Sequence, residues 1–132
     1  MSKDSNRIAI SYIENEDGDL LMGFREKEQA WTNPSGHIHE GEDPIVGMQR
    51  ELLEETGLDI KTIKLCHVEW NKDKGLMLYL FKITVDSDQE FDFSNDPDEE
   101  FSKIAYKDPN DVKDELHVPV EENIALKYWI NH

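Results

Sequence analysis

Three glutamates, Glu51, Glu54 and Glu55, fall within two turns of one predicted helix. Side chains three and four residues apart lie on the same side of a helix, so these carboxylates repel one another. A solvated acidic helix usually intersperses its glutamates with bases, but Arg50 is the only base in this segment. Carboxylate oxygens at this density are the ligands that Mg²⁺ and Mn²⁺ prefer. The spacing therefore favours a divalent-cation site over the alternative, an acidic helix face in solvent.

The helix that carries these glutamates has clear start and stop signals. Asp43 is a good N-cap, Pro44 suits the first helical position, and Gly57 suits the position after the last turn. At about 100° per residue, one side of the helix is predicted to pack on a sheet. That side holds Ile45, Val46, Met48, Gln49, Leu52, Leu53 and Thr56. The opposite side, with Gly47 and the three glutamates, is predicted to face a ligand beside the loop that precedes the helix.

The rest of the chain mixes strands and helices. Apolar runs rich in β-formers predict strands at 7–16, 19–26, 59–70, 75–85 and 101–107. Asp17-Gly18 is a strong turn signal, and it predicts that the first two strands pair as a hairpin. Residues 27–36 and 86–100 are predicted loops, and further helices are predicted from 108 and over 119–130. This order predicts an α/β fold in which helices cover a sheet.

Composition narrows the classes of partner. The 132 residues carry 30 acids and 14 bases, a net charge of −16. This charge disfavours a nucleic-acid partner and an anionic membrane surface, both of which need a basic footprint. The length predicts one domain over 1–132. Cys66 is the only cysteine and the first residues show no apolar leader, so we expect a soluble, cytoplasmic protein.

The segment 36–58 resembles the Nudix box at every defined position. The matching residues are Gly36, Glu42, Arg50, Glu51, Leu52, Glu54, Glu55, Gly57 and Leu58. The strands before the box and the β-rich run and terminal helix after it are also similar to the Nudix (MutT-like) fold, an α/β/α sandwich around a mixed β-sheet. The resemblance implies a metal-dependent hydrolase that cleaves the pyrophosphate linkage of a nucleoside diphosphate joined to another group.

The resemblance also implies roles for the box residues. Glu54 and Glu55 would be the principal ligands of Mg²⁺ or Mn²⁺, Glu51 would complete the cluster, and the Gly36 carbonyl would be an extra ligand. Arg50 would orient a helix glutamate, and its spacing allows a pair with Glu54.

Three further positions near the site stay open at this stage. Glu42 would support the loop or a further metal. The general base would be a box glutamate or, on a later loop, Glu99 or Glu100; a plain acidic surface loop is the alternative for those two. Ser35 stands where the family commonly has glycine, and it would be strained if this position needed a positive φ.

The substrate is less well defined by the sequence. The candidate substrate-binding residues are Arg25, Trp31, Glu42 and Tyr79. Phe24 and Trp70 are further stacking candidates, although such aromatics are usually core residues, and Arg25 could be an ordinary surface arginine. His37 and His39 could touch a metal or phosphate, or simply be exposed.

Asp73-Lys74-Gly75 stands where some relatives carry a substrate signature, and it matches neither the ADP-ribose nor the dinucleoside polyphosphate pattern. We expect a nucleotide-type substrate: a nucleoside triphosphate, a dinucleoside polyphosphate or a nucleotide sugar. The alternative function is a catalytically inactive Nudix-fold nucleotide sensor or an acidic protein-binding module, which the complete set of box glutamates disfavours. Either a monomer or a homodimer is compatible with the sequence.

Overall fold

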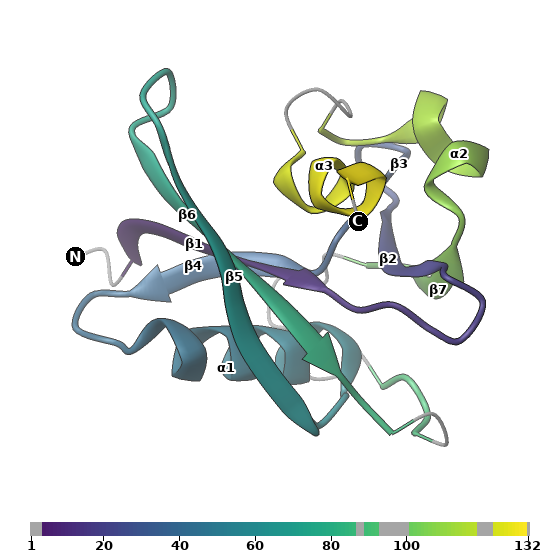
Figure 1. Cartoon of the computed structure of the whole chain (residues 1–132), viewed down its shortest axis with the longest axis horizontal. Helices are drawn as coiled ribbons and strands as arrows, with labels where there is room; N and C mark the ends of the chain where they lie inside the picture. Colours follow the sequence, from purple (N-terminus) through teal and green to yellow (C-terminus); the bar gives the residue numbers. More distant parts are fainter. Residues whose placement is uncertain (1–3, 87–88, 93–100, 119–122, 132) are drawn as a thin grey trace.

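The computed structural model describes residues 4–86, 89–92, 101–118 and 123–131. Two sheets and their flanking helices make up these ranges (Figure 1). The strands are β1 (Asp4–Tyr12), β2 (Leu20–Arg25), β3 (Ala30–Thr32), β4 (Ser35–His39), β5 (Thr62–Asn71), β6 (Leu76–Thr84) and β7 (Lys103–Lys107). The helices are α1 (Pro44–Thr56), α2 (Pro109–Val112), the 3-10 turn η1 (Lys113–Glu115) and α3 (Ile124–Asn131).

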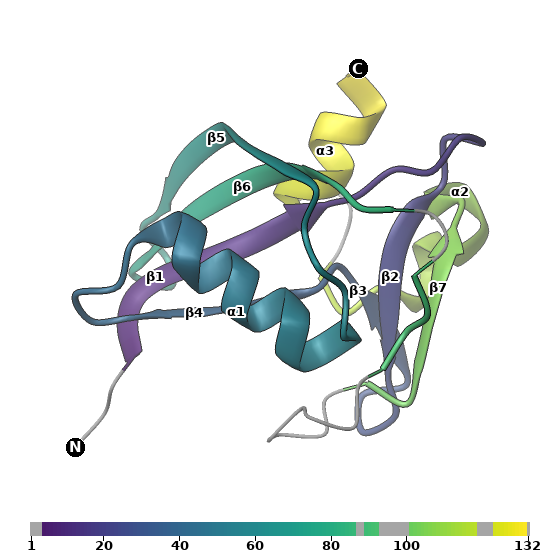
Figure 2. The same ribbon diagram turned by 90° about the horizontal axis from the view of Figure 1, so that it is seen from below.

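The larger sheet has the strand order β4-β1-β6-β5 and is mixed, because β1 and β6 run parallel while the other pairs are antiparallel. Helix α1 covers one face and α3 lies on the other (Figures 1 and 2). Side chains alternate along β6: Tyr79 and Phe81 pack on the α1 side, and Leu78 and Leu80 pack on the α3 side. The predicted mixed sheet between helices is confirmed.

The predicted pairing of the first two strands is wrong. A turn does form at Gly18, whose φ is +83°, and Glu14 and Leu20 form one antiparallel bridge. Beyond this bridge the chain diverges, because β1 already has β4 on one edge and β6 on the other. Strand β2 instead joins β3 and β7 in a second, antiparallel sheet.

The predicted loop at 27–36 contains strand structure. It includes β3 and the start of β4, which is an edge strand of the larger sheet. Backbone and side chain of Ser11 both donate to the Pro34 carbonyl, at 3.0 and 2.7 Å, and fix the link between the two strands. The segment just before the box is therefore held rigidly against β1.

Helix α1 has the predicted ends. Asp43 accepts a hydrogen bond from the Ile45 N–H at 2.8 Å, and Gly57 adopts a left-handed φ of +75° while its N–H donates to Leu53. These local signals are confirmed. No helix within the described ranges is long and apolar enough to span a bilayer.

The predicted orientation of α1 is confirmed in part, because Met48, Leu52 and Thr56 of the predicted packing side are buried. Ile45, Val46 and Leu53 are 41%, 51% and 49% exposed, whereas Gly47 and Glu55 are buried. The helix is rotated because it packs closely on β4: a Cβ at Gly47 would lie 3.2 Å from a side-chain carbon of Ile38. The buried side of the helix is therefore turned toward β4 and includes Glu55.

Candidate active site

The glutamates of α1 lie at graded depth. Glu55 is 2% exposed, while the side chains of Glu51 and Glu54 are 15% and 33% exposed. Glu51 lies directly on β4, because a Cβ added to Gly36 would overlap its carboxylate. Glycine at position 36 thus makes room for a carboxylate against the strand backbone. Glu51 is therefore the box glutamate that contacts the edge strand β4.

Arg50 connects the helix to the preceding loop. Its Nε and Nη2 donate to the two carboxylate oxygens of Glu42 at 3.0 and 3.1 Å. Its Nη1 donates to Glu51 at 2.9 Å and lies 3.5 Å from Glu54. Nη2 also donates to the His37 carbonyl at 3.0 Å. The predicted pair with Glu54 is present, but the forked contact with Glu42 is the tighter one.

Glu42 serves the loop and the arginine at once. Its Oε1 accepts from the His39 N–H at 2.9 Å, so the carboxylate closes the turn between β4 and α1. The hydrogen bond from Arg50 holds the pKa of Glu42 below its ordinary value of 4.5, and the hydrogen bond to Glu42 raises the already high pKa of Arg50. Of the two roles predicted for Glu42, support of the loop or of a further metal, these contacts favour support of the loop. They give no evidence that Glu42 binds substrate.

The donor set fits a hard divalent cation. Three carboxylates lie within two turns of one helix and one of them, that of Glu51, lies against Gly36 of β4; carboxylate and carbonyl oxygens suit Mg²⁺ or Mn²⁺. A carboxylate as buried as Glu55 strongly favours a nearby positive charge. In the part of the chain that the structure describes, no three acidic, imidazole or thiol groups already converge on one point. Glu51 and Glu54, which contact Arg50, would have to turn to share an ion.

Ser35 is not strained. Gln29, with a φ of 52°, is the one non-glycine residue of positive φ among the described residues. Ser35 instead continues into β4 with extended backbone and pairs with Ile10 of β1. The departure from the family pattern at this position therefore leaves the backbone of the site intact.

Of the predicted substrate-binding residues, Glu42 lies beside the glutamates through Arg50, whereas Arg25 and Trp31 make their contacts elsewhere. Arg25 pairs with Glu28 at 3.0 Å at the end of β2. Trp31 is 8% exposed and packs edge-to-face on Phe24, with the Lys107 ammonium over its ring at 4.8 Å. Trp31 and Phe24 are thus core residues of the second sheet. The alternative interpretation of these aromatics, as core residues, is confirmed.

Tyr79 also packs in a core. It is half-buried on β6, opposite Ala9 and Val68, in the cluster beneath α1. Trp70, two residues beyond Val68 on β5, is 50% exposed. His37 is exposed and His39 is partly buried, and both contribute backbone groups to the loop. Glu99 and Glu100 lie outside the described residues.

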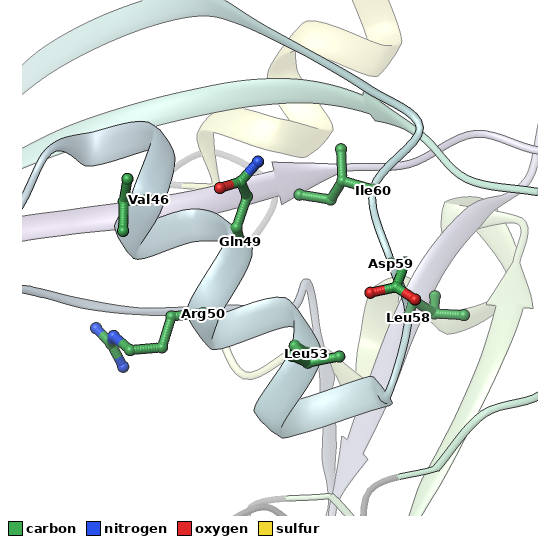
Figure 3. A pocket seen from close by; sticks show the side chains of 7 residues that line it. All are labelled: Val46, Gln49, Arg50, Leu53, Leu58, Asp59 and Ile60. Carbon is green, nitrogen blue, oxygen red and sulfur yellow. The ribbon is translucent and has the colours of Figure 1, made fainter.

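The outer side of α1 carries a shallow depression of about 370 Å³. Val46, Gln49, Leu53 and Ile60 line it, and Figure 3 shows Arg50 extending from the helix away from Ile60. The depression lies on the apolar side that was predicted to be buried. It holds none of the three box glutamates.

Sequence reasoning missed two buried amides on the other face of the sheet. Asn33 and Asn123 are 2% and 8% exposed and form a hydrogen bond of 3.2 Å across 90 residues of sequence. Asn33 precedes Pro34 and reads as a turn residue, whereas Asn123 precedes α3 and could have been recognised as its N-cap. Nothing local in the sequence brings the two together.

Comparison with known proteins agrees with this architecture. The family model for the NUDIX domain matches residues 4–128. A MutT-like protein of Streptomyces ambofaciens is 33% identical over 70 residues, which are 53% of this chain and 46% of that protein. An RNA pyrophosphohydrolase of Proteus mirabilis is 41% identical over 51 residues, which are 39% of this chain and 29% of that protein. The chain therefore matches less than half the length of these curated relatives.

A solved structure shows the same fold over the whole chain. The dihydroneopterin triphosphate pyrophosphohydrolase of E. coli superposes with a TM-score of 0.74, covers 100% of both chains and is 16% identical. With the family match over nearly all of the sequence, the chain belongs to the NUDIX domain family.

Proposed function

We propose that this protein is a divalent-metal-dependent hydrolase that cleaves the pyrophosphate linkage of a nucleoside diphosphate joined to another group. The substrate classes are nucleoside triphosphates, dinucleoside polyphosphates and nucleotide sugars. One observation carries the proposal: the Glu51 carboxylate lies against Gly36, and Arg50 contacts Glu51 and Glu54 while its forked contact with Glu42 joins the helix to the preceding loop. The names of the Proteus mirabilis and E. coli relatives, both pyrophosphohydrolases, support the same reaction class.

The roles of the residues follow from their positions. Glu54 and Glu55, with Glu51 and the Gly36 carbonyl, would hold Mg²⁺ or Mn²⁺. When bound, the ion neutralises charge on the phosphoryl oxygens and lowers the pKa of water. Arg50 fixes the direction of the Glu51 carboxylate through its own forked contact with Glu42.

The proton acceptor for the attacking water has two candidates. It is a glutamate of the box on α1, or it is Glu100 from the acidic segment after β6. A carboxylate must come within hydrogen-bond reach of the water to act as general base. A pH–rate profile of Glu100→Gln separates the two, because only a direct proton acceptor removes the acidic limb when it is replaced.

Product identification by chromatography tests the reaction. The panel holds nucleoside triphosphates, dinucleoside polyphosphates, nucleotide sugars and ADP-ribose, each with Mg²⁺ and with a chelator. We expect metal-dependent cleavage between two phosphorus atoms, lost in Glu55→Gln. Glu40→Gln, an equal change of charge at an exposed loop position, is the matched control and keeps activity. Nucleotide binding without any cleavage by the wild-type protein would contradict the proposal and favour the sensor alternative.

A further inference from the structure

Strand β5 ends the larger sheet on the side opposite β4 (Figure 2). It is ten residues long, and among the described residues its only strand partner is β6. The outer edge of such a strand presents backbone N–H and C=O groups that can pair with another chain. Soluble proteins usually protect an edge of this kind with a short strand, charges or a covering element. The outer edge of β5 is therefore a surface on which a further strand can pair.

Apolar side chains are exposed along this edge strand. Leu65, Val68 and Trp70 are 44%, 44% and 50% exposed. Leu65 and Val68 stand opposite Phe81 and Tyr79 of β6, which pack on the α1 side of the sheet. Trp70, two residues beyond Val68, points to the same side. Helix α1 packs on β4 and β1, so it leaves these three side chains in solvent. Exposed apolar side chains grouped around a tryptophan are typical of an interaction surface.

A β-bulge at Cys66 determines which residues of β5 share a face. Leu65 and His67 pair with consecutive residues of β6, so Cys66 is an extra residue in the strand. Without the bulge, Leu65 and Val68 would point to opposite faces, because they are three residues apart. The bulge brings both to the α1 side. It also leaves nine paired positions over 62–71, with His67 in the middle.

The residues on either side of His67 are self-complementary. Two copies of β5 can pair antiparallel about a two-fold axis at His67, and each contact then occurs twice. Residues at equal distances from the axis face each other in this register. The facing pairs are Leu65 with Val68 of the partner subunit, Lys64 with the partner's Glu69 and Ile63 with the partner's Trp70. Apolar side chains therefore meet on the α1 side, and opposite charges meet on the other side.

The charges around Lys64 also favour this register. Lys64 stands directly opposite Lys82 of β6, both are exposed, and like charges at such positions repel. A glutamate on the outer side of Lys64 offsets that repulsion. The whole chain has a net charge of −16, yet residues 61–74 carry four lysines against Glu69 and Asp73, a net charge of +2. Two copies can thus approach at β5 without the repulsion that the rest of the acidic surface imposes.

We propose that two copies of this protein associate through β5 into a symmetric dimer in which the two larger sheets form one continuous sheet. The Glu69 Oε1 contacts His67 of its own strand at 3.2 Å, and the second carboxylate oxygen accepts from the partner's Lys64. A second copy fits this edge better than an unrelated peptide strand, because the pattern of charged and apolar residues matches itself in reverse. Pairing consumes both β5 edges, so the assembly closes at two chains.

Sedimentation equilibrium of the wild-type protein tests the association. The mass should rise from 15.4 kDa toward twice this value as the protein concentration increases. A mass of 15.4 kDa at every concentration up to about 1 mM would overturn the proposal. The edge of β5 would then be open to a peptide strand of another protein.

Exchange of the two charges tests the register. In the dimer, Lys64→Glu places two glutamates opposite each other at both symmetric positions, and Glu69→Lys places two lysines there. Each single variant should raise the dissociation constant about tenfold or more, because two attractive pairs become repulsive. The double variant Lys64→Glu/Glu69→Lys only reverses each pair and should dimerise like the wild type. Lys113→Glu, the same change at an exposed position of η1, is the control and keeps the wild-type constant.

A mixture of the two single variants gives the sharpest readout. Lys64→Glu carries two acids at these positions and Glu69→Lys carries two lysines, so a mixed dimer has opposite charges at both. Each variant alone should be mostly monomeric at a concentration where the equimolar mixture is mostly dimeric. Circular dichroism checks that both variants are folded. A mixture that stays monomeric, or single variants that dimerise like the wild type, would overturn the proposal.

This proposal goes beyond the proposed function and can fail independently of it. The mass of the protein is measured without substrate or metal, so it does not depend on turnover. A monomer that cleaves pyrophosphates would remove the dimer and keep the hydrolase. A dimer with the predicted charge dependence but without cleavage would do the reverse.

Discussion

The two faces of the larger sheet are built in different ways. On the α1 face, the glutamates and the arginine come from one short helix and contact the strand and loop immediately before it. On the other face, a cavity is assembled from β1, β3, β4, β6 and the start of α3, which are spread over most of the chain. The first face carries the charged groups of α1 and its loop, while the second joins apolar strand residues to two buried amides. One face therefore depends on a short stretch of sequence and the other on residues distant along the chain.

The largest expected effect concerns the charged face. Glu54→Gln should lower kcat/KM by about 10²–10³-fold, the range seen when one stabilising group of a transition state is removed. The variant should stay folded, because Glu54 is one-third exposed and one repulsive charge is removed. Steady-state kinetics and thermal unfolding of the same preparation check both statements. Wild-type turnover at saturating Mg²⁺ would contradict a role for Glu54 at the metal.

A smaller effect is expected from Arg50→Lys. Lysine keeps the charge but cannot form the fork to Glu42 while also contacting Glu51. Loss of a group that orients metal ligands typically lowers activity or metal affinity by about 10- to 100-fold. The concentration of Mg²⁺ at half-maximal activity should rise. An unchanged Mg²⁺ dependence would remove the positioning role of Arg50.

Gly36→Ala tests the contact between β4 and the helix. The new Cβ would overlap the Glu51 carboxylate, and overpacking of this kind destabilises by about 1–3 kcal/mol. Gly18→Ala is the matched control: its φ of +83° is strained for alanine, yet nothing lies within 4 Å of the new Cβ. Urea unfolding should show both variants destabilised, but only Gly36→Ala should lose turnover. If Gly36→Ala kept full activity, Glu51 would not need its place on the strand.

The smallest effect concerns Glu42 and pH. Arg50 holds the pKa of Glu42 in the folded protein below the ordinary 4.5, so the pair stabilises the protein above pH 4.5. That contribution is lost as the pH falls through the lowered pKa of the folded state. Glu42→Gln should therefore reduce the free energy of unfolding at pH 7 by no more than about 1 kcal/mol after solvent screening. Urea unfolding at pH 7 and pH 3 should show the difference from wild type shrinking; a constant difference would argue against the ion pair.

Much of the candidate site was predictable because its signals are local. The Asp43 cap, the Gly57 end and the spacing of Glu51, Glu54 and Glu55 depend on contacts within a few residues. The helical wheel predicted the direction of α1 only in part. Met48 and Leu52 are buried as expected, but Val46 and Leu53 are exposed. The close approach of β4 at Gly47 turns the helix so that Glu55 is buried instead.

The strand pairing failed for a similar reason. Asp17-Gly18 predicts a turn, and a turn forms, but it cannot decide whether the flanking strands stay together. Strand β1 pairs with β4 on one edge and β6 on the other, and β2 pairs with β3 and β7. Competition among strands distant in sequence therefore decided the topology.

The sequence by itself determined the chemistry of this protein: the box residues, their spacing, the ends of the helix that carries them, and the family. Those features are set by backbone hydrogen bonding and side-chain charge over one or two helical turns. Only the tertiary structure decided that Glu55 is buried, that Arg50 donates hydrogen bonds to Glu42 and that Asn123 donates one to Asn33. Such contacts join elements whose relative placement depends on packing across the whole sheet, and no local pattern records that packing.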